Sequence, residues 1–109
     1  MNADTLLVIS NLPDRASAET LARALVERRA AACVNILAPC TSVYRWKGTV
    51  ETAEEVPLFA KTTRDRYDLL ERVVRELHPY ELPEIIAVPV GGGLPAYLDW
   101  VAAETRPAT

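Results

Sequence analysis

The chain has 109 residues, of which half are hydrophobic and a quarter are charged, a composition that predicts one globular domain over residues 1–109. Its net charge of −3 argues against a general nucleic-acid-binding protein, which would carry a basic face. No apolar stretch approaches the ~20 residues of a membrane span, and no basic segment precedes the first apolar run as in a signal peptide. We therefore expect a cytoplasmic protein with no membrane or nucleic-acid partner.

The first predicted elements are a strand and a helix. Residues 5–10 are β-branched or leucine almost throughout, and a run without alternation predicts a strand that is buried on both faces. Asp14 or Ser17 then serves as the N-cap of a helix in which leucine, alanine and valine recur at helical spacing. This helix is expected to end at the pair Arg28-Arg29, because basic residues suit a helix C-terminus.

A long hairpin follows. Residues 33–47 predict a strand that is broken near Pro39, and residues 50–62 predict the returning strand. Gly48-Thr49 is the expected two-residue turn, because glycine suits the first central position of such a turn. Pro57 interrupts the returning strand, which predicts a bulge or a sheet edge there.

The last predicted elements are a helix capped by Thr62 or Thr63, a continuous apolar strand over residues 84–90, and a short helix that begins at Pro95. The order β-α-β-β-α-β-α predicts an α+β, ferredoxin-like sandwich of four antiparallel strands, with both main helices on one face, a long central hairpin and an extra C-terminal helix.

Two features of this fold predict self-association. Strands that are apolar on both faces need a second cover, which helices on one face do not supply. The hairpin is also longer than the usual ~5–6 residues per strand, so its tip has nothing within one domain to pair with. We expect the chain to self-associate, with Tyr44 and Trp46 on one face of the hairpin forming subunit contacts rather than stacking on a nucleobase.

The richest chemistry lies at residues 78–84, where a predicted helix ends at Pro79. This stretch holds the only histidine, His78, together with Glu81 and Glu84. An imidazole beside carboxylates suits a transition-metal ion. The alternative is a structural histidine that contacts the last carbonyls of the helix.

The other candidate groups are weaker. Cys33 and Cys40 are interpreted as reduced thiols, the first a small buried side chain and the second more exposed and able to bind a soft metal. The acidic run at residues 51–55 predicts a solvated strand face. The alternative is weak binding of divalent cations by these carboxylates. Residues 91–93, a Gly-Gly-Gly turn before a helix, could hold an anion on backbone N–H groups. No nucleophile–base pair with a third orienting group is apparent, so we do not expect an enzyme.

Taken together, the segments resemble the CutA divalent-cation-tolerance proteins over nearly the whole chain. The resemblance rests on Arg29-Ala30-Ala31-Ala32-Cys33-Val34-Asn35-Ile36, Ser42-Val43-Tyr44-Arg45-Trp46-Lys47-Gly48, Glu54-Glu55, Lys61-Thr62-Thr63, His78-Pro79-Tyr80-Glu81-Leu82-Pro83-Glu84-Ile85-Ile86 and Tyr97-Leu98-Asp99-Trp100. It implies a ferredoxin-like domain, a tight homotrimer and a link to copper and other divalent metals. It also implies an architecture like that of the trimeric PII-type signalling proteins.

The chain departs from the family at the copper ligands. Copper binding in the family is tied to a cysteine at the end of the first strand and to a His-His pair, and here these positions are Ser10 and Leu77-His78. One of three ligands remains, so we expect weak binding of Cu²⁺ or another divalent cation through His78, Glu81 and Cys40, and no required cofactor. The function expected first is a trimeric metal-response protein. The alternative is a PII-like signalling trimer that senses a small anionic ligand in a subunit cleft near His78 and the glycine turn.

Overall fold

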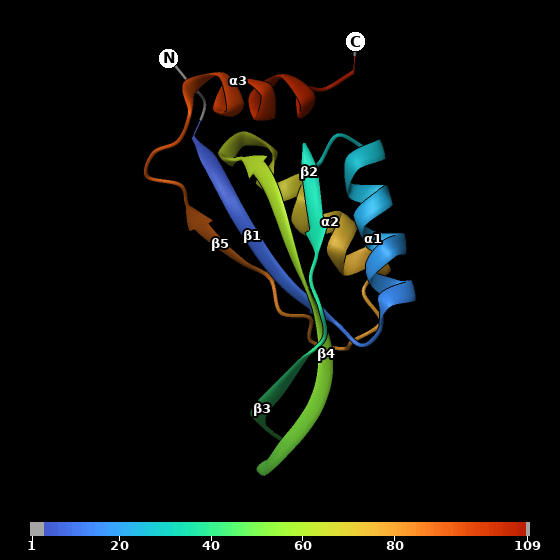
Figure 1. Ribbon diagram of the computed structural model, residues 1–109. Helices are drawn as coiled ribbons and strands as arrows, with labels where there is room; N and C mark the ends of the chain where they lie inside the picture. Colours follow the sequence, from blue (N-terminus) through green and yellow to red (C-terminus); the bar gives the residue numbers. More distant parts are fainter. Residues whose placement is uncertain (1–3, 109) are drawn as a thin grey trace.

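The computed structural model describes residues 4–108. The described residues form five strands and three α-helices (Figure 1). In chain order the elements are β1 (Thr5–Leu12), α1 (Arg15–Glu27), β2 (Cys33–Ile36), β3 (Cys40–Trp46), β4 (Thr49–Thr63), the 3₁₀ turn η1 (Arg64–Arg66), α2 (Tyr67–Leu77), β5 (Ile86–Pro89) and α3 (Pro95–Glu104).

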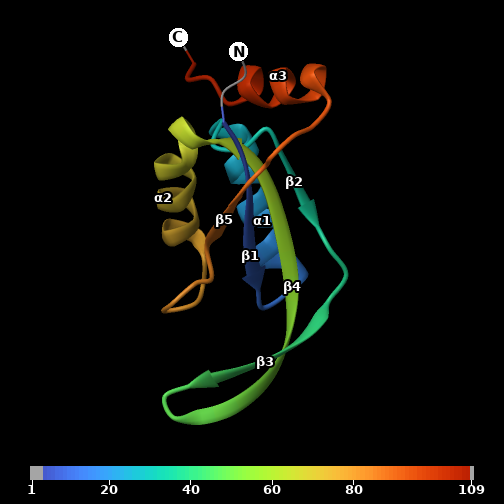
Figure 2. The ribbon, with the colours of Figure 1, turned by 90° about the vertical axis from the view of Figure 1, so that its left-hand side faces the viewer.

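All strand pairs in the sheet are antiparallel, in the order β2-β4-β1-β5, with β3 paired to the far half of β4. Helices α1 and α2 cover one face, and α3 lies across one end of the sheet while the β3–β4 hairpin projects from the other (Figures 1 and 2). The predicted α+β sandwich with its extra C-terminal helix is confirmed. Its first hairpin strand is two strands, β2 and β3, because residues 37–39 leave the ladder.

Burial explains why β1 sits at the centre. Alternate residues of β1 are buried against α1 and α2, while the intervening ones are only half-buried. The buried set shares one core with the apolar stripes of the two helices: Leu6, Val8, Leu12, Leu21, Leu25, Leu70, Val73 and Val74. The prediction that β1 is buried on both faces is therefore wrong for a single chain. Every residue of β5 is exposed.

The outer face of the sheet, opposite the helices, is apolar. Leu7 and Ile9 of β1 are half-buried there, and their cross-strand partners in β5 are Val88 and Ile86. Phe59 of β4 pairs with Ile9 on the same face. Val88 is 43% exposed and Ile86 is 50% exposed. This face lacks a cover within the part of the chain that the structure describes.

The hairpin differs from its prediction in two details. Its turn is Lys47-Gly48, one residue earlier than expected, because both residues adopt positive φ (50° and 83°) and Trp46 pairs with Thr49. The β1–β4 register runs through Pro57 without a bulge. The carbonyl of Pro57 accepts from the N–H of Leu37 on the β2 side, so the missing proline N–H faces the same side, where the β2–β3 break begins.

The remaining boundaries also shift. The second helix begins at Tyr67 after a 3₁₀ turn, rather than directly after Thr62 or Thr63. Asp14 is the N-cap of α1, where its carboxylate accepts from the N–H of Ser17 and its pKa is lowered by that bond. Pro95 is the first residue of α3, as predicted. Among residues 4–108, no helix has the length and apolarity to cross a membrane.

Candidate functional site

His78 connects the corner between α2 and β5 to strand β1 through side-chain hydrogen bonds. The helix ends at Leu77, and the imidazole, only 7% exposed, folds back toward β1. Nε2 lies 2.7 Å from the carbonyl oxygen of Asn11, and Nδ1 accepts from the N–H of Tyr80 at 3.2 Å. Because β5 begins at Ile86 opposite Ile9, the Asn11 carbonyl lies beyond the β1–β5 ladder, and His78 supplies its missing partner.

These two contacts fix the chemistry of the imidazole. A nitrogen that accepts from an N–H carries no proton, so Nδ1 is bare and Nε2–H donates to the carbonyl. Burial lowers the pKa of His78, opposed by the Asn11 carbonyl and by the nearby carboxylate of Glu55. The histidine is therefore neutral and has no free lone pair for a metal ion. Its structural interpretation fits this geometry.

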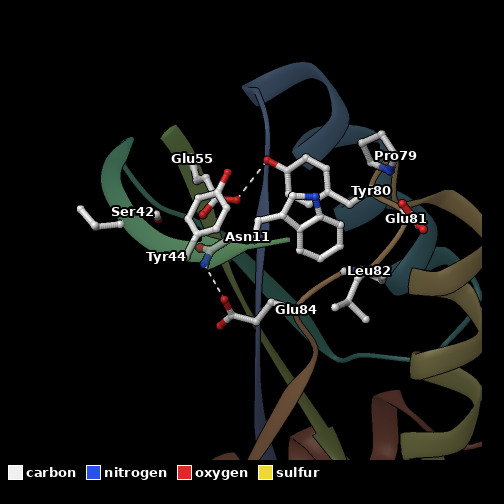
Figure 3. A pocket seen from close by; sticks show the side chains of 12 residues that line it. Asn11, Ser42, Tyr44, Glu55, Pro79, Tyr80, Glu81, Leu82 and Glu84 are labelled. Carbon is white, nitrogen blue, oxygen red and sulfur yellow. Dashed lines mark hydrogen bonds between the residues drawn. The ribbon is translucent and has the colours of Figure 1, made fainter. Parts of the chain in front are cut away.

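A pocket of about 930 Å³ opens beside this corner. One wall comes from the hairpin arm (β3 and the part of β4 that pairs with it, residues 40–55), and the other comes from residues 79–84 (Figure 3). We call it the arm pocket. It is lined by Asn11, Ser42, Val43, Tyr44, Trp46, Glu55, Pro79, Tyr80, Glu81, Leu82, Pro83 and Glu84.

Two hydrogen bonds hold the corner in place, one to the arm and one to β1 (Figure 3). The phenol of Tyr80 donates to Oε2 of Glu55 at 3.0 Å, which joins the corner to β4. Nδ2 of Asn11 donates to Oε1 of Glu84 at 2.8 Å, which joins β1 to the corner. Burial and the bond to the Glu55 carboxylate raise the pKa of Tyr80 to about 12, so this phenol stays protonated and remains a donor.

The structure separates the three predicted metal ligands. His78 is buried behind the pocket, Glu81 is exposed on its rim, and Cys40 is exposed at the start of β3 and does not line it. Across residues 4–108, no three His, Cys, Asp or Glu side chains form a group that could hold a metal ion. In one chain these residues do not make a metal centre, and a role for them stays a prediction.

Sequence reasoning missed Glu55. It read the residue as part of a solvated acidic run, but Glu55 is only 9% exposed. The alternation of side chains along a strand could have indicated its position. Glu55 pairs with Cys40, and Cys40, Tyr44 and Trp46 share one face of β3 because they are an even number of residues apart. Glu55 therefore lies on the same side of the arm as the two aromatic residues. Those two aromatic residues share a face as predicted, and that face lines the arm pocket.

The glycine turn is remote from this site. Val90 donates to the carbonyl of Thr5 at the start of β1, whereas His78 contacts Asn11 near its end, roughly 20 Å away at ~3.3 Å per strand residue. Cys33 also lies elsewhere, 3.4 Å from the phenol oxygen of Tyr97 on α3. One chain therefore does not combine His78 and the glycine turn in a single cleft.

Comparison with known proteins supports one family. The family described as CutA1 divalent ion tolerance protein matches residues 6–104. The divalent-cation tolerance protein CutA of Thermus thermophilus is 46% identical over 99 residues, covering 91% of this chain and 96% of that protein. Protein CutA of Mus musculus is 47% identical over 94 residues, covering 86% of this chain but 53% of that protein, so the chain spans about half of this animal relative.

Solved structures agree with the sequence matches. The crystal structure of CutA from Xylella fastidiosa has a TM-score of 0.92 and 44% identity, covering 95% of this chain and all of that one (100%). The structure of CutA1 from Oryza sativa has a TM-score of 0.93 at 36% identity, covering 98% of each chain. The resemblance seen in the sequence is confirmed, and this chain belongs to the CutA1 divalent ion tolerance protein family.

Proposed function

We propose that this chain is a non-catalytic, cytoplasmic, homotrimeric divalent-cation tolerance protein that binds copper or another divalent cation weakly. The observation that carries the proposal is the family match over residues 6–104. The names of the matched family and of the Thermus thermophilus relative refer to tolerance of divalent ions or cations and not to a reaction.

The trimer is supported by surfaces that a single chain leaves open. The outer sheet face exposes Val88 and Ile86. The arm projects beyond the domain, exposing Val43 (68%) and Val50 (61%), and β3 pairs with β4 alone. An assembly that covered the sheet face and paired the arms would bury more than ~2,000 Å², the range of obligate complexes.

Weak metal binding is supported by the donors. One neutral histidine with both nitrogens engaged, one exposed thiol and scattered carboxylates give each chain few strong ligands. If Glu81 and Cys40 do bind a metal ion, a neighbouring subunit must complete its coordination.

The assembly test compares two exposed valines. Val88→Glu places a charge on the outer sheet face, and Val26→Glu places the same charge on α1, where Val26 is 42% exposed. Light scattering at micromolar concentration should give about three times the 12.0 kDa chain mass for the parent and for Val26→Glu. Val88→Glu should lower that mass. A monomeric parent, or a Val88→Glu trimer as stable as the parent, would contradict the proposed interface.

The metal test uses the exposed ligands, whose substitution leaves the core intact. Calorimetry with Cu²⁺ at pH 7.5 should show weak binding that Glu81→Gln or Cys40→Ser reduces, while Glu104→Gln on α3 leaves it unchanged. Equal affinity in all four proteins would remove Glu81 and Cys40 from the site. Sub-nanomolar binding by the parent would show that assembly brings in ligands that one chain does not display.

A further inference from the structure

The arm pocket has charge of one sign. Glu55, Glu81 and Glu84 line it, and none of the other lining residues is Lys, Arg or His. A concave site lined by carboxylates attracts cations and repels anions. This argues against an anionic ligand here and in favour of a cationic one.

The carboxylates are spread too widely to hold one metal ion. Glu81 and Glu84 lie on the corner wall and Glu55 lies on the arm wall, and the described residues include no three-ligand metal grouping. A pocket of about 930 Å³ falls within the ~300–1,000 Å³ of small-molecule sites. The dimensions therefore suit an extended organic cation.

The walls between the carboxylates are aromatic. Tyr44 and Trp46 line the pocket on the arm side, and Tyr80 lines it on the corner side. Figure 3 shows the two tyrosines on opposite walls. Aromatic faces attract ammonium and guanidinium groups, and tryptophan does so most strongly. The Trp46 ring already has one such contact, because Nζ of Lys47 lies 5.5 Å from its centroid. That contact places one cationic side chain beside the pocket lining.

Glu55 is the deepest charge in the pocket. It is more than nine-tenths buried, its hydrogen bond from Tyr80 occupies only Oε2, and no Lys or Arg within residues 4–108 forms an ion pair with it. A buried carboxylate without a cation is costly. A bound ammonium or guanidinium group beside Glu55 would offset that cost through charge-assisted hydrogen bonds.

From these observations we infer that the arm pocket binds an extended organic cation that carries ammonium or guanidinium groups. One cationic group lies between Glu55 and the aromatic side chains of Tyr44 and Trp46. A second lies toward Glu81 and Glu84 at the rim. This site shares Glu81 with the proposed metal ligands, but it needs no metal ion.

The test uses agmatine, which joins a guanidinium to an ammonium group through a four-carbon chain. Its matched control is 4-guanidinobutyrate, which keeps the guanidinium and replaces the ammonium end by a carboxylate. Calorimetry is performed on the assembled protein with EDTA present, so that metal binding does not contribute. The proteins are the parent, Glu55→Gln, Trp46→Leu and the surface control Glu104→Gln. Glutamine retains an acceptor for Tyr80, so Glu55→Gln removes the charge with little change in shape.

We expect saturable binding of agmatine to the parent and to Glu104→Gln, at least tenfold weaker binding to Glu55→Gln and Trp46→Leu, and at least tenfold weaker binding of 4-guanidinobutyrate. Equal affinity of the parent and Glu55→Gln would overturn the proposal, as would preference for the anionic analogue. Absence of agmatine binding to the parent would also overturn it. If Glu55→Gln then also lowered the assembled mass, the pocket would be filled by a basic side chain of a second copy.

Discussion

Replacing His78 gives the sharpest test of how this corner is held. In His78→Ala the carbonyl of Asn11 and the N–H of Tyr80 both lose their partner. A buried polar group left unpaired costs about 1–3 kcal/mol of stability. Asn11 and Tyr80 are only half-buried, so the cost for each of these two backbone groups is expected near the lower end of that range. The tilted contact between the His78 and Tyr80 rings, with centroids 4.8 Å apart, is lost as well. We expect His78→Ala to lower the free energy of unfolding by about 2–4 kcal/mol.

A second variant separates the two hydrogen bonds. Nε2 of glutamine is as many bonds from Cα as Nε2 of histidine, so His78→Gln should keep the donor to Asn11 and lose the acceptor for Tyr80. We expect it to recover about half of the stability lost in His78→Ala. Urea unfolding at matched protein concentration measures this, because association contributes to apparent stability.

The stability that His78 contributes should depend on pH, which packing alone does not predict. Burial lowers the pKa of His78 below its ordinary 6.5, so the unfolded chain takes up the proton more readily than the folded one. Stability from the neutral imidazole is therefore complete above pH 6.5 and declines as the pH falls through the lowered pKa. Glutamine does not titrate, so the stability gap between parent and His78→Gln should narrow from pH 7.5 to pH 5. A constant or widening gap, or a His78→Ala variant within about 0.5 kcal/mol of the parent, would refute this account.

Three further predictions follow from other parts of the chain. The hydroxyl of Ser10 is buried without a hydrogen-bond partner, so Ser10→Ala should raise the urea midpoint by an amount equivalent to about 1 kcal/mol; a lower midpoint would show that the hydroxyl is satisfied. Cys33 and Cys40 pair with β4 residues six positions apart, roughly 20 Å by strand rise, so alkylation without reductant should label both, and a two-dalton deficit in one chain would contradict this. Arg29 donates to carbonyls at the end of α3. Arg29→Ala should therefore cost about 1–3 kcal/mol and speed hydrogen exchange in α3, whereas unchanged exchange there would show that packing alone holds the helix.

The local elements were readable from the sequence because short-range physics sets them. Asp14 caps α1 by bonding to a residue three positions on, and Pro95 can begin a helix because its missing N–H is not needed there. The apolar spacing of α2 predicts the stripe that it buries. Together they give the α+β order and, with segments such as Lys61-Thr62-Thr63 and residues 78–86 that carry the resemblance, the family.

The candidate site depended on contacts that the sequence does not specify. Asn11, Glu55 and Tyr80 are brought together across as many as 69 positions by the β1–β4 register and the turn after α2. A change of one residue in that register would move Glu55 to the opposite face of the arm, because side chains alternate along a strand. The same geometry places both ring nitrogens of His78 in hydrogen bonds with backbone groups of Asn11 and Tyr80. The amino-acid sequence determines which ionisable groups are available, whereas strand pairing and burial decide which of them face the pocket and which stabilise the fold.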